Sequence, residues 1–409
     1  MTVESRAPLS AVEAAPQEGA AEGAVEAKAA IMGGTPSGRS GGRRSSAIDV
    51  LRGLAVLSVM LHHLPFSSMG LGHSVGGFTV FPSPAFARGV EWGKYGVHLF
   101  LVISGFCIHM PWASAASDQQ PSFLQFWKRR LARLYPPYIV VVLGCLALMA
   151  VGWRLTGSLA AFGYGPDQSL LLDVLLLLLL AQNLNGASHR IGDGPLWSLA
   201  LEEQLYLLYF PLLWMRKRWG WARTLTVVTG VTLLWRWVFL RLGASDLLTV
   251  GPALWLVWAF GAFAVEVHTG RIPCSDRWRS YPLTAVVLGI AAALIHTGTL
   301  WGVALGVALL GPGFFLLIIR ATVTEAPKSR WLALVGRALS SVGVASYSLY
   351  LVHDVGYKVA KQAALTLGAG PALALVARVL VGVLGALLVY RLVELPAHRC
   401  ARTSTLPFP

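Results

Sequence analysis

The stretch LWSLALEEQLYLLYFPLLWM, residues 196–215, is long and apolar enough to cross a bilayer, yet it carries Glu202 and Glu203 side by side. A transmembrane helix needs about 20 predominantly apolar residues. A carboxylate at the centre of such a helix costs about 2.5–3.5 kcal/mol on insertion scales, so acids inside membranes generally serve a function. The stretch therefore predicts a membrane helix that carries part of a functional site.

The composition of the whole chain agrees with a membrane protein. Of its 409 residues, 55% are hydrophobic and only 13% are charged, whereas soluble proteins carry about 25% charged residues. The net charge of +14 lies largely in short loops between apolar runs, as the positive-inside rule describes for membrane proteins. We therefore expect a polytopic membrane protein in contact with lipid, without a nucleic-acid partner and without a metal site.

The chain divides by composition into three parts. Residues 1–46 are rich in Ala, Gly, Glu and Ser and cannot bury a core, which predicts a disordered cytoplasmic tail. Residues 47–396 form the expected membrane domain, and residues 397–409 form a short cytoplasmic tail. The apolar segments of the membrane domain lie at 47–66, 94–112, 134–153, 168–184, 196–215, 222–240, 250–268, 282–299, 301–320, 339–357 and 371–393.

The charges of the loops indicate which segments cross the membrane. If 168–184 crossed, the basic loops 216–223, 268–280 and 320–337 would all lie outside. If 168–184 does not cross, all three loops lie inside, as the positive-inside rule favours. The sequence thus predicts an all-α bundle of about ten transmembrane helices plus one re-entrant or packed helix, with both termini cytoplasmic.

The first apolar segment carries Arg52 and His63 eleven residues apart. At about 100° and 1.5 Å per residue, the two side chains lie about 20° apart around the helix and about 16 Å apart along it. His62 points about 100° away from His63. A snorkelling arginine and an interfacial histidine would explain the two residues separately, but their alignment favours a shared site.

Five motifs stand in the order and spacing of the membrane acyltransferase type 3 family, which the chain resembles over about residues 45–396. They are IDVLRGLAVLSVMLHH (48–63), YGVHLFLVISGFCIH (95–109), FWKRRLARLYPPY (126–138), GPLWSLALEEQLYLLY (194–209) and ASYSLYLVHD (345–354). The resemblance implies a multi-pass bacterial enzyme of the cytoplasmic membrane. It also implies transfer of an acyl group, expected to be acetyl, from acyl-CoA as co-substrate to a hydroxyl of a carbohydrate or glycosylated acceptor. No bound cofactor is expected.

The resemblance also assigns residues. The arginine and histidine of the family's first span correspond to Arg52 and His63. Its basic motif corresponds to Arg129, Arg130 and Arg133, and its WSLxxEEQFY motif to Trp197, Ser198, Glu202, Glu203, Gln204 and Tyr206. The chain departs from the family at His98, where many relatives have an acid, and after His353, where many have tryptophan.

Acyl transfer to an alcohol needs a base for the hydroxyl proton and a group that orients this base. A histidine can exchange a proton near neutral pH, so His63 is the expected base. Glu203, or alternatively Glu202, would orient it. The other possibility is that the two acids only fix helix packing.

The donor carries phosphates, for which arginine is well suited. We expect Arg130 and Arg133, three residues apart on one helix face, to bind them together with Arg129 and Arg52, although membrane anchoring would also explain basic residues here. Tyr347, Tyr350 and His353 would line the acceptor site with Trp197, Ser198 and Tyr206. Hydrogen bonding between helices is the alternative role for these side chains.

A secondary transporter with an intramembrane His and Glu proton relay is the alternative function. Transporters usually contain two related halves with corresponding broken helices, and this chain has no such self-similarity. A non-catalytic scaffold would not need His63 or the paired acids. The sequence leaves open the acyl group, the acceptor, a possible acyl-enzyme intermediate and the oligomeric state.

Overall fold

The computed structural model describes residues 38–64, 74–75, 78–79, 89–114, 122–157, 168–185, 191, 195–323 and 329–403. Residues 1–45 and 46–409 form separate compact units. Most of the expected tail, residues 1–37, lies outside the described part, and helix α2 begins at Gly38. The following description concerns the unit formed by residues 46–409.

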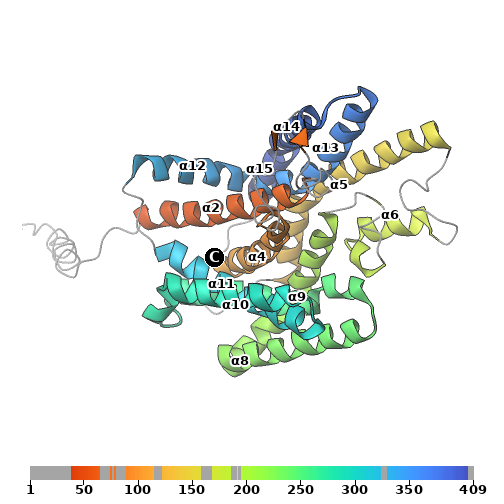
Figure 1. Ribbon diagram of the computed structural model, residues 1–409. Coiled ribbons are helices and arrows are strands. Elements are labelled where there is room, and N and C mark those ends of the chain that lie inside the picture. The colour runs from red at the N-terminus through yellow and green to blue at the C-terminus, as the bar shows by residue number, and fades with distance from the viewer. Residues whose placement is uncertain are drawn as a thin grey trace, which may run out of the picture. The chain divides into compact units, whose positions relative to one another are not determined.

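The described part of this unit is almost entirely helical (Figure 1). Its main helices are α2 (Gly38–His62), α4 (Gly96–Ser114), α5 (Phe123–Thr156), α6 (Leu170–Leu178), α8 (Leu196–Arg241), α9 (Gly251–His268), α10 (Tyr281–His296), α11 (Leu300–Val323), α12 (Arg330–Val344), α13 (Ser346–Thr366), α14 (Pro371–Val389) and α15 (Leu395–Thr403). Shorter elements are the strands β1 (Ser74–Val75) and β2 (Phe78–Thr79), the 3-10 turns η1 (Trp92–Tyr95), η3 (Gln182–Leu184), η4 (Ser245–Thr249) and η5 (Asp276–Arg279), and the π-helical turn η6 (Tyr390–Glu394).

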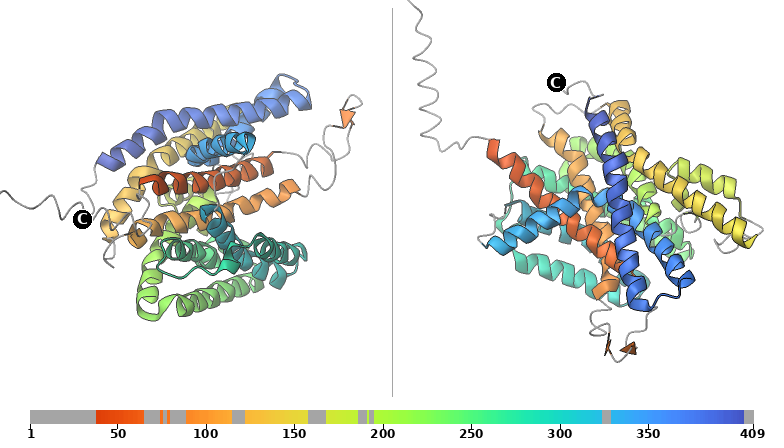
Figure 2. Two further views of the ribbon diagram at one scale, coloured as in Figure 1. Left: turned by 90° about the vertical axis from the view of Figure 1, so that its left-hand side faces the viewer. Right: turned by 90° about the horizontal axis from the view of Figure 1, so that it is seen from above.

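Two hydrophobic cores hold the helices together. One joins residues 48–55 of α2 to α4, α8, α9 and α11, and the other joins the last turns of α2 to α5, α6 and α13. Figure 2 shows α2 and α4 between the α13–α14 pair on one side and the α8–α10 group on the other. The two helices in the middle therefore contribute side chains to both halves of the unit.

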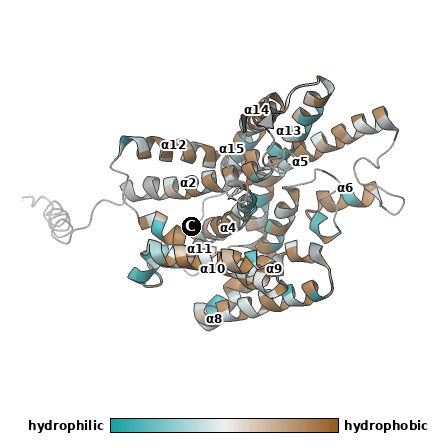
Figure 3. Ribbon diagram, viewed as in Figure 1, coloured by the Kyte–Doolittle hydropathy of each residue, from teal (hydrophilic) through white to brown (hydrophobic). Residues whose placement is uncertain are grey.

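The outward faces of several helices are hydrophobic, as Figure 3 shows. On α14, Leu380, Leu384 and Leu388 repeat every four residues and are 53%, 62% and 59% exposed. Residues four apart share one helix face, so these three form an apolar stripe with no protein partner among the described residues. Such a surface is expected where a protein contacts lipid, because large exposed apolar patches are rare on soluble monomers.

Five described helical segments are long and apolar enough to cross a membrane, and a sixth is added if α12 and α13 are counted as one span. The five are Gly89–Ala113, Phe123–Leu155, Asp246–His268, Leu300–Val323 and Ala372–Cys400. Together they indicate a helical membrane bundle, whereas the number of ten spans stays a prediction. Helix α6 has nine residues, about 14 Å at the usual rise, which is too short to cross, in agreement with the exclusion of 168–184.

Three boundaries differ from those predicted. Helix α5 begins at Phe123, eleven residues before the expected segment, so the basic residues 128–133 are helical. The expected segments 196–215 and 222–240 are two halves of α8, separated by a break at Gly220, where φ is 74° and ψ is 172°. The expected span 339–357 is broken at Ala345, where α12 and α13 meet at 74°. Hydropathy alone did not reveal this break because both sides of it are apolar.

Candidate active site

A cavity of about 120 Å³ lies between α2, α4, the start of α5, the first half of α8 and the start of α13. Eight of the residues predicted for the site line it: Arg52, Arg130, Arg133, Ser198, Glu202, Tyr206, Tyr347 and Tyr350. Ser104, Cys107, Ser346 and Glu394 are further polar residues of its wall. The structure therefore brings residues of all five sequence motifs to one cavity.

Glu202 and Glu394 are the two acids of this cavity, and two hydroxyl groups hold Glu202. Ser104 Oγ and Tyr206 Oη each donate a hydrogen bond to Glu202 Oε1 at 2.5 Å. Trp258 Nε1 donates to Ser104 Oγ at 3.4 Å, which fixes the serine from α9. Hydrogen bonds to a charged group are worth about 1.5–3 kcal/mol, so these two donors offset much of the cost of a carboxylate within the bundle.

Three guanidinium groups form the cationic wall of the cavity. Arg52 pairs with Asp49, with an NH1–Oδ1 distance of 3.6 Å. Arg133 Nε donates to His398 Nε2 at 3.1 Å. Arg130 lies over the rings of Phe126 and Tyr206, at 5.5 and 5.7 Å from their centroids. No described carboxylate forms an ion pair with Arg130, so its guanidinium can receive the anionic group of a ligand.

The cavity ends at Tyr350. Its hydroxyl lies 2.6 Å from Ser198 Oγ, and the serine also donates to Pro195 O at 2.9 Å. Tyr347 Oη donates to Leu134 O at 2.7 Å. These bonds join α8 and α5 to the start of α13, so the hydroxyl groups predicted from the SYSLY motif both line the site and connect helices.

His63 and His353 form a pair beyond this wall. Their rings meet edge to face, with centroids 5.0 Å apart, and His63 Nδ1 lies 3.3 Å from His353 Nε2. The ring of Tyr350 lies 6.0 Å from that of His353. One aromatic side chain thus separates the histidine pair from the cavity.

Main-chain carbonyl groups determine which nitrogen of each ring carries the proton. His63 Nδ1 lies 2.9 Å from Val59 O, and His353 Nδ1 lies 3.0 Å from Leu349 O. A carbonyl oxygen can only accept, so both Nδ1 atoms are donors. In the neutral rings, Nε2 of each then carries the lone pair. His63 Nδ1–H can also reach His353 Nε2, which leaves His63 Nε2 as an available base.

The structure does not place the paired acids beside His63. His63 forms hydrogen bonds with Val59 and His353, whereas Glu202 forms them with Ser104 and Tyr206. Neighbouring residues on a helix point about 100° apart, so Glu203 turns away from the cavity toward Tyr135 and Tyr138 of α5. The side chain in contact with His63 is therefore that of His353, which the sequence placed only in the site lining.

Two other predicted residues lie off the cavity wall. Arg129 belongs to the same turn as Arg130 but is absent from the lining. Trp197 packs against both hydrophobic cores, so its observed contacts are those of a packing residue. Arg52, Arg130 and Arg133 thus remain as the arginines of the cavity.

The sequence analysis did not predict the buried polar cluster around His109. The side chain of His109 is fully buried. Its Nε2 lies 3.0 Å from Glu266 Oε1, and its Nδ1 lies 3.0 Å from Tyr209 Oη. Arg216 pairs with the same carboxylate at 3.0 Å. These residues come from α4, α8 and α9, and no local pattern in the sequence links residues so far apart.

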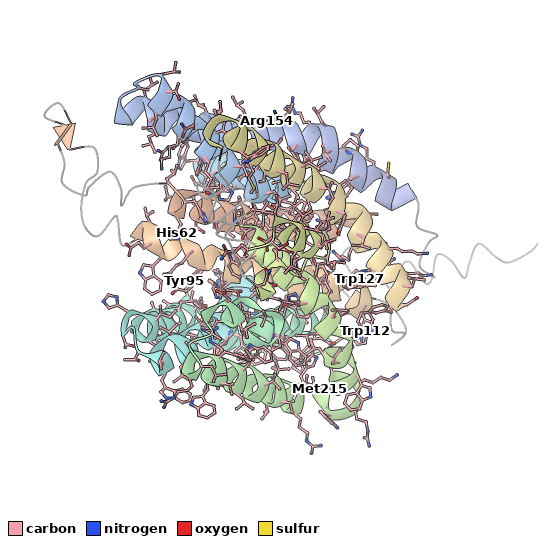
Figure 4. The ribbon with its side chains drawn as sticks, turned by 90° about the vertical axis from the view of Figure 1, so that its right-hand side faces the viewer. His62, Tyr95, Trp112, Trp127, Arg154 and Met215 are labelled. Carbon is pink, nitrogen blue, oxygen red and sulfur yellow. The ribbon has the colours of Figure 1, made fainter. Side chains whose placement is uncertain are left out.

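The cavity and the histidine pair lie at different levels of the bundle. In Figure 4, Trp112, Trp127 and Met215 lie toward one end of the unit and His62 and Tyr95 toward the other. The arginines at the start of α5 belong to the first end, and His63, next to His62, belongs to the second. A ligand with a charged end and a reactive end could therefore span the bundle between them.

Comparison with known proteins gives one match. A family model described as an acyltransferase domain matches residues 45–391. This range contains every residue assigned above to the cavity except Glu394, and both histidines of the pair. No curated protein and no solved structure matches the chain.

Proposed function

Because the chain belongs to the membrane acyltransferase type 3 family, we propose that it transfers an acyl group, acetyl in the simplest case, from acyl-CoA to a hydroxyl of a carbohydrate or glycosylated acceptor. The observation that carries this proposal is the cavity, which has arginines on its wall and lies one tyrosine ring from the histidine pair. The family match favours an acyltransferase over the transporter considered from the sequence.

The arginines of the cavity are the proposed binding site for the donor. Arg130 has no carboxylate partner among the described residues, and Arg52 and Arg133 line the same hollow. Guanidinium groups form strong, charge-assisted hydrogen bonds to phosphate oxygens. With the phosphates of acyl-CoA at these arginines, its pantetheine arm would extend past Ser198 and Tyr350 toward the histidine pair.

The proposed reaction uses His63 as general base. His63 Nε2 takes the proton of the acceptor hydroxyl while the hydroxyl oxygen of the acceptor attacks the thioester carbonyl carbon. The C–S bond of the thioester breaks when the tetrahedral intermediate collapses. The departing thiolate receives the proton from His63, so that CoA thiol and the ester are the products. His353 acts as a positioning residue, because its Nε2 accepts from His63 Nδ1–H and favours the tautomer with a basic Nε2.

The proposed topology places the arginine end of the unit in the cytoplasm, where acyl-CoA is made. We infer ten spans in the cytoplasmic membrane with both termini inside, because the basic loops 216–223, 268–280 and 320–337 then share one side. The histidine pair would then lie in the outer half of the membrane, where an acceptor arriving from outside could reach it.

Donor affinity of the purified protein tests the role of the arginines. We expect Arg130→Gln to lower the affinity for acetyl-CoA about tenfold or more, because a charge-assisted hydrogen bond is worth about 1.5–3 kcal/mol. Arg129→Gln removes the same charge from the neighbouring residue, which does not line the cavity, and should bind acetyl-CoA nearly as well as the unmodified protein.

The measurement is isothermal titration of acetyl-CoA into protein in phosphatidylcholine nanodiscs, followed by transfer of the labelled acetyl group to membrane glycans. Equal affinities for the unmodified protein and Arg130→Gln would assign the arginines to membrane anchoring. Intact donor binding without acyl transfer to any glycan would refute the proposed acceptor class.

A further inference from the structure

A second cationic cluster lies beside the last turns of α2, at the end of the unit opposite Trp127. It consists of Lys94 and Tyr95 of η1, His98 of α4 and Arg236 of the second half of α8, and we call it the Arg236 cluster. Figure 4 shows Tyr95 at this end, close to His62. The rings of Tyr95 and His98 are 5.3 Å apart, and both residues interact electrostatically with Arg236.

Arg236 is buried without a counterion among the described residues. Its exposed fraction is 4%, and neither a hydrogen bond nor an ion pair to another described residue satisfies its guanidinium. The nearby Nδ1 of His98 is likewise buried without a hydrogen-bond partner. An arginine remains protonated in proteins, and an uncompensated buried charge costs several kcal/mol. The cluster thus lacks an anion that its chemistry requires.

The cluster lies beside the histidine pair. A Cβ atom on Gly93 would be 2.2 Å from Ser58 O and 3.1 Å from His62 Cβ, so η1 packs directly on the last turns of α2. The ring of His62 lies 5.3 Å from that of His63. A group bound at the cluster would therefore be near the proposed base and on the side away from the arginines of the cavity.

The side chains of the cluster become less exposed to solvent from Lys94 to Arg236. Lys94 is exposed, Tyr95 and His98 are half-buried, and Arg236 is buried. A small anionic group could thus pass from a solvated lysine to a guanidinium in the interior. Since the acyl donor is assigned to the cavity, the ligand left for this cluster is the acceptor.

We propose that the Arg236 cluster binds an anionic group, a carboxylate or a phosphate, on the carbohydrate acceptor. This proposal rests on the proposed acyl transfer and names the class of its acceptor as an acidic or phosphorylated sugar. The guanidinium group of Arg236 pairs with the anion, and Tyr95 and Lys94 supply further hydrogen-bond donors. The sugar extends from the cluster toward His63.

Ligand-induced stabilisation tests the proposal without relying on activity. The full chain in phosphatidylcholine nanodiscs is heated with methyl glucuronide, inorganic phosphate or the neutral methyl glucoside, and the unfolding temperature is recorded. A ligand that binds only the folded protein raises this temperature, and the rise grows with the logarithm of the ratio of its concentration to its Kd. We expect at least one anion to raise it and the neutral glucoside to have no effect.

Arg236→Met and Arg241→Gln form a matched pair of variants. Arg241 is exposed and lies five residues later on the same helix. Removing a buried charge that has no partner should raise the unfolding temperature of the ligand-free protein, while the affinity for the anion should fall tenfold or more. Arg241→Gln should bind the anion as the unmodified protein does, and Arg236→Lys should keep part of the affinity.

Three outcomes would overturn the proposal. The first is that no anion stabilises the unmodified protein more than the glucoside. The second is that Arg236→Met lowers the stability of the ligand-free protein and binds the anion unchanged, which would make Arg236 a packing residue. The third is that only nanodiscs containing phosphatidylglycerol give an Arg236-dependent stabilisation, which would assign the cluster to a lipid headgroup. The proposed acyl transfer would survive each of these results.

Discussion

Two imidazole rings meet where α2 ends, and the main-chain carbonyls of their own helices keep Nδ1 of each ring protonated. His63 Nε2 is consequently the atom available to a hydroxyl proton, with His353 behind it. The neighbouring ring of His62 faces η1 instead. The side chains of His62 and His63 thus have different surroundings because successive helical residues point about 100° apart.

Single substitutions of the three histidines should separate these tasks. Since loss of a general base lowers rates about 10²–10⁴-fold, His63→Ala should reduce acetyl transfer by this factor and leave acetyl-CoA binding intact. His353→Gln should lower kcat less and leave the KM for acetyl-CoA unchanged, because it removes the positioning contact only. His62→Ala should remain active. The measurement is acetyl transfer by each purified variant at saturating acetyl-CoA, with the KM determined beside it.

The pattern of the three variants decides the assignment. An active His63→Ala with an inactive His353→Gln would make His353 the base and His63 the positioning residue. An inactive His62→Ala with an active His63→Ala would show that the helical phase of this turn is wrong. Activity in all three variants would place the base outside the pair.

At the residue scale, helix geometry predicted positions but not partners. The alignment of Arg52 with His63 follows from their spacing, and the structure places Arg52 on the cavity wall and His63 where α2 ends. The partner of His63 depends on the packing of α13, 290 residues away, and the partner of Glu202 depends on Ser104 of α4. Neither contact has a signal in the local sequence, which is why an acid was expected where a histidine lies.

At the element scale, two glycines allow α4 and α9 to touch. A Cβ atom on Gly105 would lie 2.2 Å from Trp258 O, and one on Gly261 would lie 1.9 Å from Val102 O. Small residues let helices in membranes approach closely. The close contact also brings Trp258 to Ser104, which in turn donates to Glu202.

Alanine at these glycines should separate the two helices. We expect Gly105→Ala to lower the free energy of unfolding by about 1–3 kcal/mol, the usual cost of overpacking, and to reduce transfer by shifting Ser104. Gly144→Ala is the control, because nothing lies within 4 Å of the added methyl group, and it should be neutral or slightly stabilising. Thermal unfolding of both variants in the same detergent provides the comparison. Equal stability of the two variants would contradict the role given to the close contact.

Helix breaks were the least predictable elements. Both halves of α8 are apolar, and the break between them depends on the positive φ of Gly220, a conformation that glycine adopts easily. The break between α12 and α13 follows from a tertiary contact, because Gly343 packs against the backbone of Asp49 on α2. Composition and hydropathy predicted which regions are helical, whereas their ends and bends depend on contacts between distant segments.

At the scale of the whole molecule, basic residues gather at one end of the unit. Arg216 and Arg271 both lie over the ring of Trp112, at 4.5 and 4.9 Å from its centroid. In Figure 4, Trp112 lies at the same end as Trp127, beside the arginines of α5. Basic residues from three separate segments therefore meet at one end, as expected if this end faces the cytoplasm.

Chemical labelling of positions on either side of the second half of α8 tests this orientation. The stretch from Trp221 to Arg241 has 21 residues, about 31 Å of helix, which matches the hydrocarbon thickness of a bilayer of about 30 Å. We expect Leu242→Cys, at a position that is 70% exposed, to react from outside intact cells with a membrane-impermeant maleimide. Arg218→Cys should react only after permeabilisation, in both cases in a background without the native cysteines. Strong labelling of Arg218→Cys in intact cells would place the arginine end outside, away from cytoplasmic acyl-CoA. That result would mean that segment 168–184 crosses the membrane, and the ten-span topology would be wrong.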